Sequence, residues 1–397
     1  MNATERCLVA FEPRAPFAVS RRLSLGHRRE TERRVPGRTL RGALAGLLQT
    51  VDPGLAEDLY AGRIVISDAR PIPDGWPTLP LPASLRSCKR FPGFAVDQES
   101  HGALDLLIAL LRRQRQPDAA VPMYCPVCET GPAHAKTPLK PLGGVGFQRL
   151  VEGGQPRYRQ VVIETGDRTH TAIDHLTGTV APGFLYEEEF ILPTGKWSAV
   201  LTVPAGRYAQ LRAALAGRTL RIGASRTRGL GHWQIATVEP ERQPWGLPPL
   251  TERLSRFQAA VGAAAGELLV PMLCVTPVVL PDTWGRFTIA PDPAAMAAAL
   301  DPAGACLTAD RLEPVLALAE LERVGGWNSL PRLPAPSDLA LAPGSVLVWK
   351  VRAPDLAAVA QVLAAIERNG LGYRRAEGLG TVVFAHPIHC EVREHVQ

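Results

Sequence analysis

The feature that most constrains the fold is a segment that occurs twice, about 150 residues apart. Each copy consists of a helix-like stretch, a basic turn, a Gly-Leu-Gly triplet and an apolar strand. The turn and strand read IGASRTRGLGHWQI in the first copy and LGYRRAEGLGTVVF in the second. Because self-similarity at a fixed distance indicates repeated structural units, the sequence predicts a duplicated domain.

The first copy closes an ordered series of elements. Leu40, Leu44 and Leu47 follow the spacing of one helical face. With residues of about 70–150 set aside, the patterns predict strand 7–19, helix 35–48, strand 158–167, a polar connection 168–183, strand 184–203, helix 207–217 and strand 220–239. The order β-α-β-β-α-β is typical of a ferredoxin-like domain, an antiparallel sheet with two helices on one face.

The second half begins after a proline-rich stretch, which we interpret as a linker over 241–266. The patterns then predict strand 267–280, a partly helical Ala-rich stretch 292–324, strand 345–353, helix 355–370 and strand 371–387. Residues 281–344 carry no strong signal of their own. We therefore predict an α+β protein with two ferredoxin-like domains, 1–240 and 267–397, and a loop-rich insertion of about 70–150 in the first.

A pair of cysteines in this insertion has the spacing of a metal knuckle. In Cys125-Pro-Val-Cys128, the turn directs two thiolates at one ion. A four-coordinate Zn²⁺ needs two more ligands, and Cys88 is the natural third, with His134 or His101 as the fourth. A redox role is the alternative, but the proline-rich flanks do not fit a thioredoxin-type helix start. We predict a structural Zn²⁺ that stabilises the insertion; the remaining cysteines are interpreted as packing residues.

Several classes of protein are excluded by composition and layout. No run of about 18 uncharged apolar residues is present, so no transmembrane span is expected. The first residues lack the basic-then-apolar order of a signal peptide. Seven scattered cysteines do not make a secreted disulfide framework. We expect a cytoplasmic protein that is not associated with a membrane.

The chain is basic, with a formal net charge of +6, and its basic residues are mainly arginine, with only five lysines. Arginine suits phosphate recognition because the planar guanidinium donates two hydrogen bonds at once. A GC-rich genome would also favour arginine over lysine. The location of the arginines along the chain therefore has to decide between the two explanations.

The two basic turns place arginine next to glycine. Glycine lets the backbone approach a ligand, and backbone N–H groups together with guanidinium groups can hold a phosphate. Neither turn is a P-loop or a dinucleotide fingerprint, and the alternative is an ordinary glycine turn in a hairpin. Because both turns lie at equivalent places, we predict RNA contacts for Arg226, Arg228, Gly229, Gly231, Arg374, Arg375, Gly378 and Gly380.

These motifs carry a resemblance to a known family. The first turn resembles the glycine-rich loop of the RAMP superfamily, the RNA-binding subunits of CRISPR effector complexes. VPGRTLRGAL at 35–44 is similar to that superfamily's Pro-Gly-Ser-Ser-Leu-Lys-Gly-Ala-Leu helix start. RTHTAIDHLTGTVAPGFLYE at 168–187 is similar to a run in RAMP subunits of type III effectors. The two-domain RAMP subunit of type III-D complexes is the most similar in layout, although the second domain matches only at its final turn.

Two further groups of residues are candidates for RNA contact. Arg38, Thr39 and Arg41 start the helix 35–48, where the helix dipole and free N–H groups favour an anion. The alternative is helix capping with solvated charge. Arg168 and His170 lie in the polar connection and could meet a phosphate or stack on a base, or could simply be surface residues.

The resemblance implies a function without catalysis. We predict a structural subunit that holds the guide crRNA, including its 5′ repeat-derived tag, with other RAMP subunits and the large polymerase-like subunit as partners and target RNA contacted indirectly. One alternative is an endoribonuclease that processes precursor RNA with His27 as a general acid or base, or that cleaves target RNA with Asp174 and a metal. Another is a zinc-stabilised interaction module without RNA contact.

Overall fold

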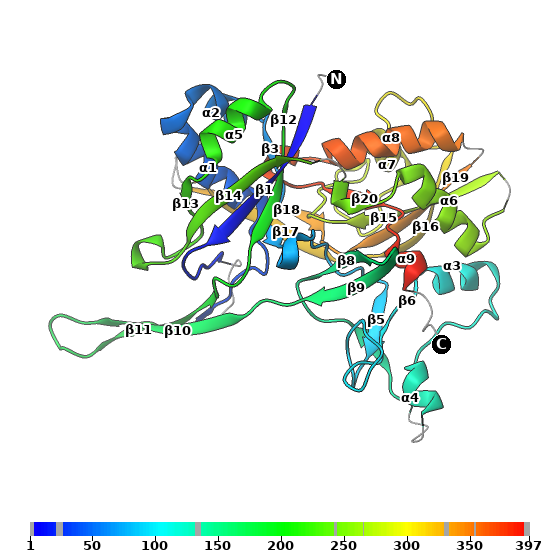
Figure 1. The fold of residues 1–397 in the computed structure, drawn as a ribbon, viewed down its shortest axis with the longest axis horizontal. Helices are drawn as coiled ribbons and strands as arrows, with labels where there is room; N and C mark the ends of the chain where they lie inside the picture. The colour runs from blue at the N-terminus through cyan, green and yellow to red at the C-terminus, as the bar shows by residue number, and fades with distance from the viewer. Residues whose placement is uncertain are drawn as a thin grey trace. The chain divides into compact units, whose positions relative to one another are not determined.

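The computed structural model describes residues 4–20, 27–131, 136–241, 244–264, 266–328, 333–352 and 355–392. The protein is a mixture of helices and strands, divided into two compact units (Figure 1). Unit 1 comprises Met1–Thr78, Val161–Arg242 and Ala376–Gly378. Unit 2 comprises Leu79–Gln160, Gln243–Arg375 and Leu379–Gln397. None of the helices in these described ranges is long and apolar enough to cross a membrane.

Unit 1 is built on one antiparallel sheet. Its strands are β1 (Thr4–Pro13), β3 (Val65–Ile66), β4 (Arg70–Pro71), β12 (Trp197–Pro204), β13 (Thr219–Arg221) and β14 (His232–Pro240). They lie in the order β13-β14-β1-β12-β3, and β4 also pairs with β12. In this register Cys7 pairs with Leu201 and Val9 pairs with Val238. Strand β1 therefore lies at the centre of the sheet, between its two long neighbours β14 and β12.

Three helices pack with this sheet: α1 (Gly37–Val51), α2 (Pro53–Tyr60) and α5 (Tyr208–Leu215). The predicted apolar face of α1 is buried at Leu40, Leu44 and Leu48. Helix α2 was not expected from the sequence. It starts at Asp52, whose carboxylate accepts from the backbone N–H of Leu55 at 3.1 Å. The capping aspartate and the following proline are sufficient reason for a new helix here.

A long hairpin extends from unit 1, formed by β10 (Thr165–Ile173) and β11 (Val180–Ile191) (Figure 1). The short strand β2 (Arg28–Arg29) pairs with β11 in parallel. The expected polar connection 168–183 is therefore mostly strand, and the two strand stretches expected within 184–203 belong to β11 and β12. Arg168 and His170 alternate with Thr169 and Thr171 with period two, which is compatible with a solvent-exposed strand.

Unit 2 contains a second antiparallel sheet. Its strands are β15 (Glu267–Cys274), β16 (Leu312–Leu318), β19 (Val346–Arg352) and β20 (Val382–Phe384), in the order β16-β19-β15-β20. Helices α7 (Pro293–Leu300) and α8 (Leu356–Asn369) and the hairpin β17 (Leu321–Asn328)–β18 (Leu333–Leu341) connect them. In the Ala-rich stretch 292–324, α7 is the only helix. Residues Leu312–Leu318 of this stretch instead form strand β16, which pairs with β19.

The predicted linker 241–266 contains a buried helix, α6 (Leu250–Val261), which follows a short 3₁₀ helix η3 (Pro244–Gly246). Leu254 and Phe257 have no exposed surface and belong to the core of unit 2. The side chain of Arg253 on the same helix pairs with Glu367 of α8 at 2.8 Å, with both side chains buried. The prolines before α6 suggested a linker. The apolar residues of α6, however, recur every three or four positions, so one face of the helix packs in the core.

The segment that we expected to be an insertion in the first domain groups with unit 2. It contains η1 (Pro73–Gly75), β5 (Leu85–Cys88), β6 (Ala103–Asp105), α3 (Leu107–Arg115), α4 (Pro126–Thr130), β7 (Leu139–Pro141), β8 (Gly146–Glu152) and β9 (Gln155–Val161), of which η1 alone lies in unit 1. Leu107 and Leu111 of α3 are part of the same core as α6. Asp105 of β6 accepts from Ser84 at 2.7 Å and pairs with His389 of α9 (Ile388–Glu391) at 3.0 Å.

Candidate metal centre and nucleic-acid interface

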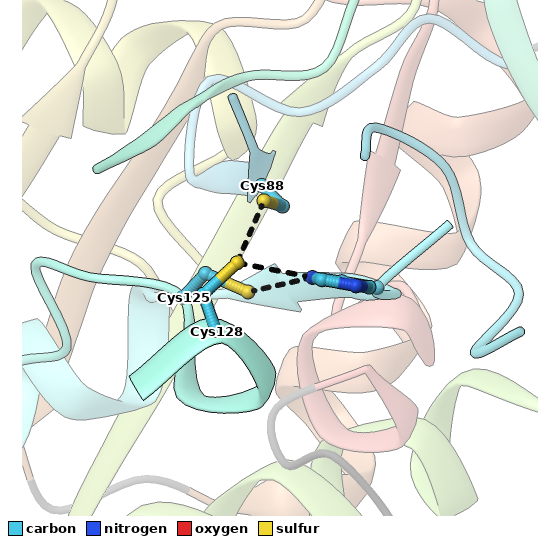
Figure 2. A group of neighbouring side chains, drawn as sticks. Cys88, Cys125 and Cys128 are labelled. Carbon is cyan, nitrogen blue, oxygen red and sulfur yellow. Dashed lines mark hydrogen bonds between the residues drawn. The ribbon is translucent and has the colours of Figure 1, made fainter. Parts of the chain in front are cut away.

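Three thiols and one imidazole meet in unit 2, and Figure 2 shows the three cysteine side chains directed toward one another. Cys88 is the last residue of β5, Cys125 caps α4, and Cys128 lies within α4. His101 lies in the segment between β5 and β6. Because β5 pairs with β7, Cys88 at the end of β5 lies close to Cys125 and Cys128, which precede β7 in the sequence.

The distances between these atoms are those of a tetrahedral site. The Sγ atoms of Cys88 and Cys128 are 3.7 Å apart. The Nδ1 atom of His101 lies 3.2 Å from Cys128 Sγ and 3.5 Å from Cys125 Sγ, and all four atoms lie within 4.8 Å of one another. A tetrahedron with Zn–S of about 2.3 Å and Zn–N of about 2.0 Å has edges of about 3.8 Å and about 3.5 Å. The four side chains therefore fit one Zn²⁺ ion without an open position.

Apolar side chains enclose the four ligand atoms. Phe91, Val127 and Leu139 pack around the buried thiols. The ring of Phe91 lies over the imidazole of His101 with centroids 4.3 Å apart, and the backbone N–H of His101 donates to the Phe91 carbonyl oxygen at 3.0 Å. These contacts fix the orientation of the imidazole, as the surroundings of a metal ligand must.

The pKa values of two of the thiols bear on whether the group can hold a cation. Burial raises the pKa of Cys125 to about 12. At Cys88 burial acts in the same direction, but hydrogen bonds from the backbone of Phe91 and Arg90 outweigh it and lower the pKa of the thiol. Three thiolates so close together would repel one another, so a bound cation is what allows all three to be deprotonated.

The fourth side chain of the group is the histidine that lies earlier in the chain. The sequence left His134 and His101 as the two candidates. Among the described residues, His101 completes the group with Cys88, Cys125 and Cys128. His134 lies outside the described residues.

The two Gly-Leu-Gly turns have the same backbone conformation. Positive φ angles occur at equivalent positions, at 53°, 87° and 76° for Ser225, Gly229 and Gly231, and at 59°, 86° and 85° for Arg374, Gly378 and Gly380. A short 3₁₀ helix fills each turn, η2 (Arg226–Arg228) in the first and η4 (Arg375–Glu377) in the second. The repeat seen in the sequence is therefore a repeat of backbone geometry.

Most of the predicted RNA-binding glycines have a packing reason for being glycine. A Cβ atom on Gly231 would overlap the carbonyl oxygen of Ile222, and one on Gly380 would overlap that of Leu371. A Cβ atom on Gly378, which belongs to unit 1, would overlap the backbone of Ile66 and Gly37 in the same unit. Gly229 differs, because a Cβ atom there would meet nothing within 4 Å. Of these four glycines, Gly229 alone has open space above its Cα atom.

Each turn is joined to the returning strand of the hairpin in its own half of the sequence. In the first turn, the Ser225 hydroxyl donates to Glu188 of β11 at 2.6 Å, and the Arg228 guanidinium donates to the Tyr186 hydroxyl at 2.7 Å. At the position equivalent to Ser225, Arg374 pairs with Asp338 of β18 at 2.7 Å. Arg374, which we predicted to contact RNA, is thus also engaged by a carboxylate of the protein.

Exposed arginines occupy a second pair of equivalent positions. Arg226 and Arg375 each begin the 3₁₀ helix of their turn, and both are exposed. Guanidinium groups that extend from a fixed backbone turn are suited to phosphate contacts. The third residue of the 3₁₀ helix differs, being Arg228 in the first turn and Glu377 in the second. The first turn is therefore the more basic of the two.

Arg168 and His170, predicted from the sequence, are brought together at Glu188. His170 Nε2 lies 3.1 Å from the Glu188 carboxylate, and the Arg168 guanidinium lies 3.6 Å from it. Burial alone would raise the pKa of Glu188, but the bonds from Ser225 and His170 lower it below its ordinary value. Glu188 therefore stays ionised and connects the hairpin to the first turn.

An aromatic group completes this network. The rings of His170 and Tyr186 stack with centroids 4.9 Å apart. The guanidinium of Arg29 lies over the Tyr186 ring at 4.2 Å from its centroid. Tyr186 and Glu188 were not predicted as site residues. The alternation in Tyr-Glu-Glu-Glu, which puts residues 186 and 188 on one face of a strand, was the signal that could have identified them.

The start of α1 differs from the expectation. The backbone N–H of Gly37 donates to the carboxylate of Asp68 at 2.9 Å, and Asp68 pairs with Arg34 at 2.8 Å. The protein's own buried carboxylate therefore occupies the place that we predicted for an external anion. This carboxylate satisfies one of the free N–H groups of the helix start, that of Gly37.

The basic side chains of α1 also have internal roles. Arg41 donates to the carbonyl oxygen atoms of Leu59 at 2.9 Å and Tyr60 at 3.2 Å, at the end of α2. Arg38 is half-buried, and burial lowers the pKa of its guanidinium despite nearby carboxylates. Thr39 is half-buried in the same first turn. These residues support the fold of unit 1, and no external ligand is needed to explain them.

The two candidate catalytic residues lie apart. The His27 carbonyl oxygen accepts from the backbone N–H of Glu187, which pairs with Thr169 of β10; Asp174 lies five residues after Thr169, directly beyond the end of β10. Five residues of strand span about 17 Å. Asp174 accepts from the backbone N–H of Leu176 at 2.8 Å and so shapes the hairpin tip. Within the described ranges, the single group of residues suited to hold a metal is the one at Cys88, and it does not include Asp174.

A residue that sequence reasoning missed is Trp284, whose surface is 82% exposed. The carboxylate of Asp282 accepts from the backbone N–H groups of Trp284 at 2.9 Å and Arg286 at 2.8 Å, and also pairs with the Arg286 side chain. An aspartate three residues before a glycine is a turn signal, and it could have identified this turn. The turn holds Trp284 in solvent.

Two family matches cover most of the chain. Residues 142–383 match the family described as CRISPR-associated protein (Cas_Cmr3). Residues 27–232 match the RAMP superfamily. The second match covers the α1 segment, the hairpin β10–β11 and the first turn. The first match includes both Gly-Leu-Gly turns.

Comparison with solved structures gives distant likenesses. A chain in the cryo-EM structure of the Type III-B Cmr-beta bound to cognate target RNA is 13% identical, with 87% of this chain and 86% of that chain covered and a TM-score of 0.41. A Cas6 product complex is 14% identical, with 96% and 100% covered and a TM-score of 0.39. Thermus thermophilus Cas6 is 13% identical, with 97% and 99% covered and a TM-score of 0.36. A search among curated proteins found no match.

Proposed function

The chain belongs to the RAMP superfamily and to the family of CRISPR-associated proteins named Cas_Cmr3, and we propose that it is a non-catalytic RNA-binding subunit of a type III effector complex. Its ligand is the guide crRNA, including the repeat-derived 5′ tag. The observation that carries the proposal is the pair of Gly-rich turns with one backbone conformation, each presenting an exposed arginine at the same position, Arg226 or Arg375.

The surroundings of the first turn support RNA as its ligand. Arg226 and Arg228 supply positive charge, Gly229 leaves open space at the backbone, and Tyr186 and His170 supply aromatic rings. Guanidinium groups bind phosphates, and aromatic rings stack on unpaired bases. The buried carboxylate of Glu188 fixes this arrangement before any ligand is present.

The strand orders support the proposal that each unit is built on a ferredoxin-like domain. In unit 1 the elements β1, α1, β3, β12, α5 and β14 follow the order β-α-β-β-α-β, with the strands arranged as β14-β1-β12-β3. In unit 2 the elements β15, α7, β16, β19, α8 and β20 do the same, with the strands arranged as β20-β15-β19-β16. Both sheets thus place the fourth, first, third and second strands side by side.

The proposed partners are other RAMP subunits and the large polymerase-like subunit of the effector, with target RNA reached through the guide. The resemblance of residues 168–187 to RAMP subunits of type III effectors and the match to the Cas_Cmr3 family support type III effectors in general. The neighbouring genes would identify the subtype, because each subtype has its own set of subunits.

Replacing Arg226 and Arg228 with glutamine tests the proposal. A single-stranded RNA loses about 0.7 of its salt slope for each phosphate contact removed. We expect the double variant to bind a labelled guide RNA at least tenfold more weakly, with a slope of log Kd against log salt that is lower by about 1.4. The measurement is a fluorescence anisotropy titration at several salt concentrations.

The matched control replaces Arg212 and Arg218, two exposed arginines of unit 1 outside the turn, with glutamine. This variant has the same net charge and should keep the affinity of the parent chain to within about threefold. Equal binding by the two double variants would exclude the first turn as the RNA site. Absence of RNA binding by the parent chain would favour an interaction module instead.

A further inference from the structure

Lysine is rare in this chain, and its distribution is uneven. Lys89, Lys136 and Lys140 are three of only five lysines, and all three lie in the segment that holds the candidate metal centre. A preference of the genome for arginine over lysine explains why lysines are few. It does not explain why most of them are gathered within one small module, so a specific reason is needed.

Strand pairing places these lysines on one face. Cys88 pairs with Leu139, and the next residue, Lys89, donates its backbone N–H to the Pro138 carbonyl oxygen at 3.2 Å. Because side chains alternate along paired strands, Lys89, Lys136 and Lys140 lie on the face opposite to Cys88. One face of this small sheet therefore carries the thiols, and the reverse face carries the lysines.

An exposed aromatic ring shares the face of the lysines. Tyr124 forms a β-bridge with Pro138, which puts both side chains on the same side as Lys136 and Lys140. Its side chain is exposed, and the ammonium group of Lys136 lies 6.0 Å from the ring centroid. We call the set Lys89, Lys136, Lys140 and Tyr124 the lysine face.

Among the described residues, no carboxylate neutralises the charges of the lysine face. All three lysines are exposed, and none of them forms an ion pair with any residue in the described part of the chain. Lys350 is different, because it pairs with Glu313 at 2.8 Å. Three unpaired ammonium groups on one side of a small sheet attract a polyanion, and the attraction falls with salt.

We propose that the lysine face is a second, separate binding site for single-stranded RNA, and that the metal centre on the reverse face gives it a fixed shape. Ammonium groups contact successive phosphates, and the Tyr124 ring stacks on an unpaired base. The exposed aromatic ring among the cations favours RNA over an acidic protein segment, which offers no base to stack. The inference rests on the proposed function as an RNA-binding subunit and adds a site that lies outside both Gly-rich turns.

The test compares two triple variants of the full chain. One carries Lys89→Gln, Lys136→Gln and Lys140→Gln. The control carries Arg113→Gln, Lys196→Gln and Arg368→Gln, three exposed positions with the same total charge. The probe is a labelled, unstructured RNA of mixed sequence, titrated at several salt concentrations. We expect the slope of log Kd against log salt to fall by about 2 in the lysine variant and by less than 1 in the control.

The other outcomes separate the two proposals. If the parent chain binds RNA and the two triple variants have equal slopes, the lysine face is not an RNA site while the proposed function stands. If the parent chain does not bind RNA, the proposed function itself fails. If the lysine variant keeps RNA binding but loses binding of poly-glutamate, the face binds an acidic protein and the inference is wrong.

A conservative variant guards against misfolding as the cause of weak binding. Replacing the same three lysines with arginine keeps the charge, and this variant should keep the salt slope of the parent chain. A fall in slope equal to that of the glutamine variant would show that charge is not the property that matters, and it would overturn the inference.

Discussion

Glu188 is the residue on which the first Gly-rich turn depends. Its side chain is almost fully buried, yet it accepts from Ser225 and lies within 3.1 Å of His170 and 3.6 Å of Arg168. One carboxylate thus connects the hairpin β10–β11 to the turn that carries Arg226 and Arg228. Removing its charge would leave the Arg168 guanidinium without its counter-charge and Ser225 with a weaker acceptor, which is costly in a buried position.

We expect Glu188→Gln to lower the free energy of unfolding by about 2 kcal/mol at neutral pH, the usual worth of hydrogen bonds to a charged group. The pKa of Glu188 is lowered by its partners in the folded protein, so its contribution is complete above the ordinary glutamate pKa, and is lost as the pH falls through the lower, folded value. Urea unfolding of both proteins should therefore show a constant difference from pH 7 to about pH 5 and a shrinking difference below about pH 4. An equal difference at pH 3.5 would contradict this role.

At the scale of elements, a metal ion held by Cys88, His101, Cys125 and Cys128 would explain how a loop-rich segment keeps a fixed shape. β5, β7 and the short helix α4 are too small to form a core of their own, and the buried side chains among them are mainly the three cysteines and their apolar neighbours. Metal binding energy can replace missing apolar burial in a module of this size.

We therefore expect one equivalent of Zn²⁺ in the purified protein, measured by elemental analysis. The variant His101→Ala should lose at least 90% of the metal and should unfold this segment first, as seen by faster hydrogen exchange over 85–141. His175→Ala is the matched control, because His175 is an exposed histidine in the turn of the β10–β11 hairpin. A metal-free protein with the same exchange rates would contradict the assignment.

The sequence predicted the elements with strong periodicity and failed where packing decided the outcome. The apolar face of α1, the strands β1, β14, β15 and β19, and helix α8 were visible as patterns. Helix α6 was interpreted as part of a linker because several prolines precede it in the sequence. Its apolar face could be recognised as a core face only once the unit-2 core against which it packs was known. The three cysteines were predictable from spacing, but the choice of His101 required the three-dimensional position of a residue 24 positions before Cys125.

For the site on unit 1, residue types were predictable and their roles were not. Arg168 and His170 were predicted as RNA-contact residues, and that role stays a prediction; the structure places both at Glu188, which is buried and gives no signal as a binding residue. Arg41 and Arg374 match the family's motifs in the sequence, but carbonyl and carboxylate groups of the protein engage them. A motif shows which residue types are present, whereas partners that are distant in sequence decide which charges stay available.

At the scale of the whole molecule, the position of the basic residues is more informative than their number. A net charge of +6 on 397 residues is small. Arginines at the first turn and lysines at the metal module are exposed, whereas those at Asp68, Glu188 and Asp338 are paired. The protein therefore presents discrete basic surfaces, as expected of a subunit that holds one RNA strand along a defined path.

The central claim is that the first Gly-rich turn and the adjacent hairpin hold the guide RNA. The most direct measurement is ultraviolet crosslinking of the protein in its RNA-containing complex, followed by mass spectrometry of the crosslinked peptides. We predict crosslinks at Tyr186 or within 223–231 that disappear in the variant with Arg226→Gln and Arg228→Gln. Crosslinks confined to other parts of the chain, in a complex that contains the guide, would contradict the account.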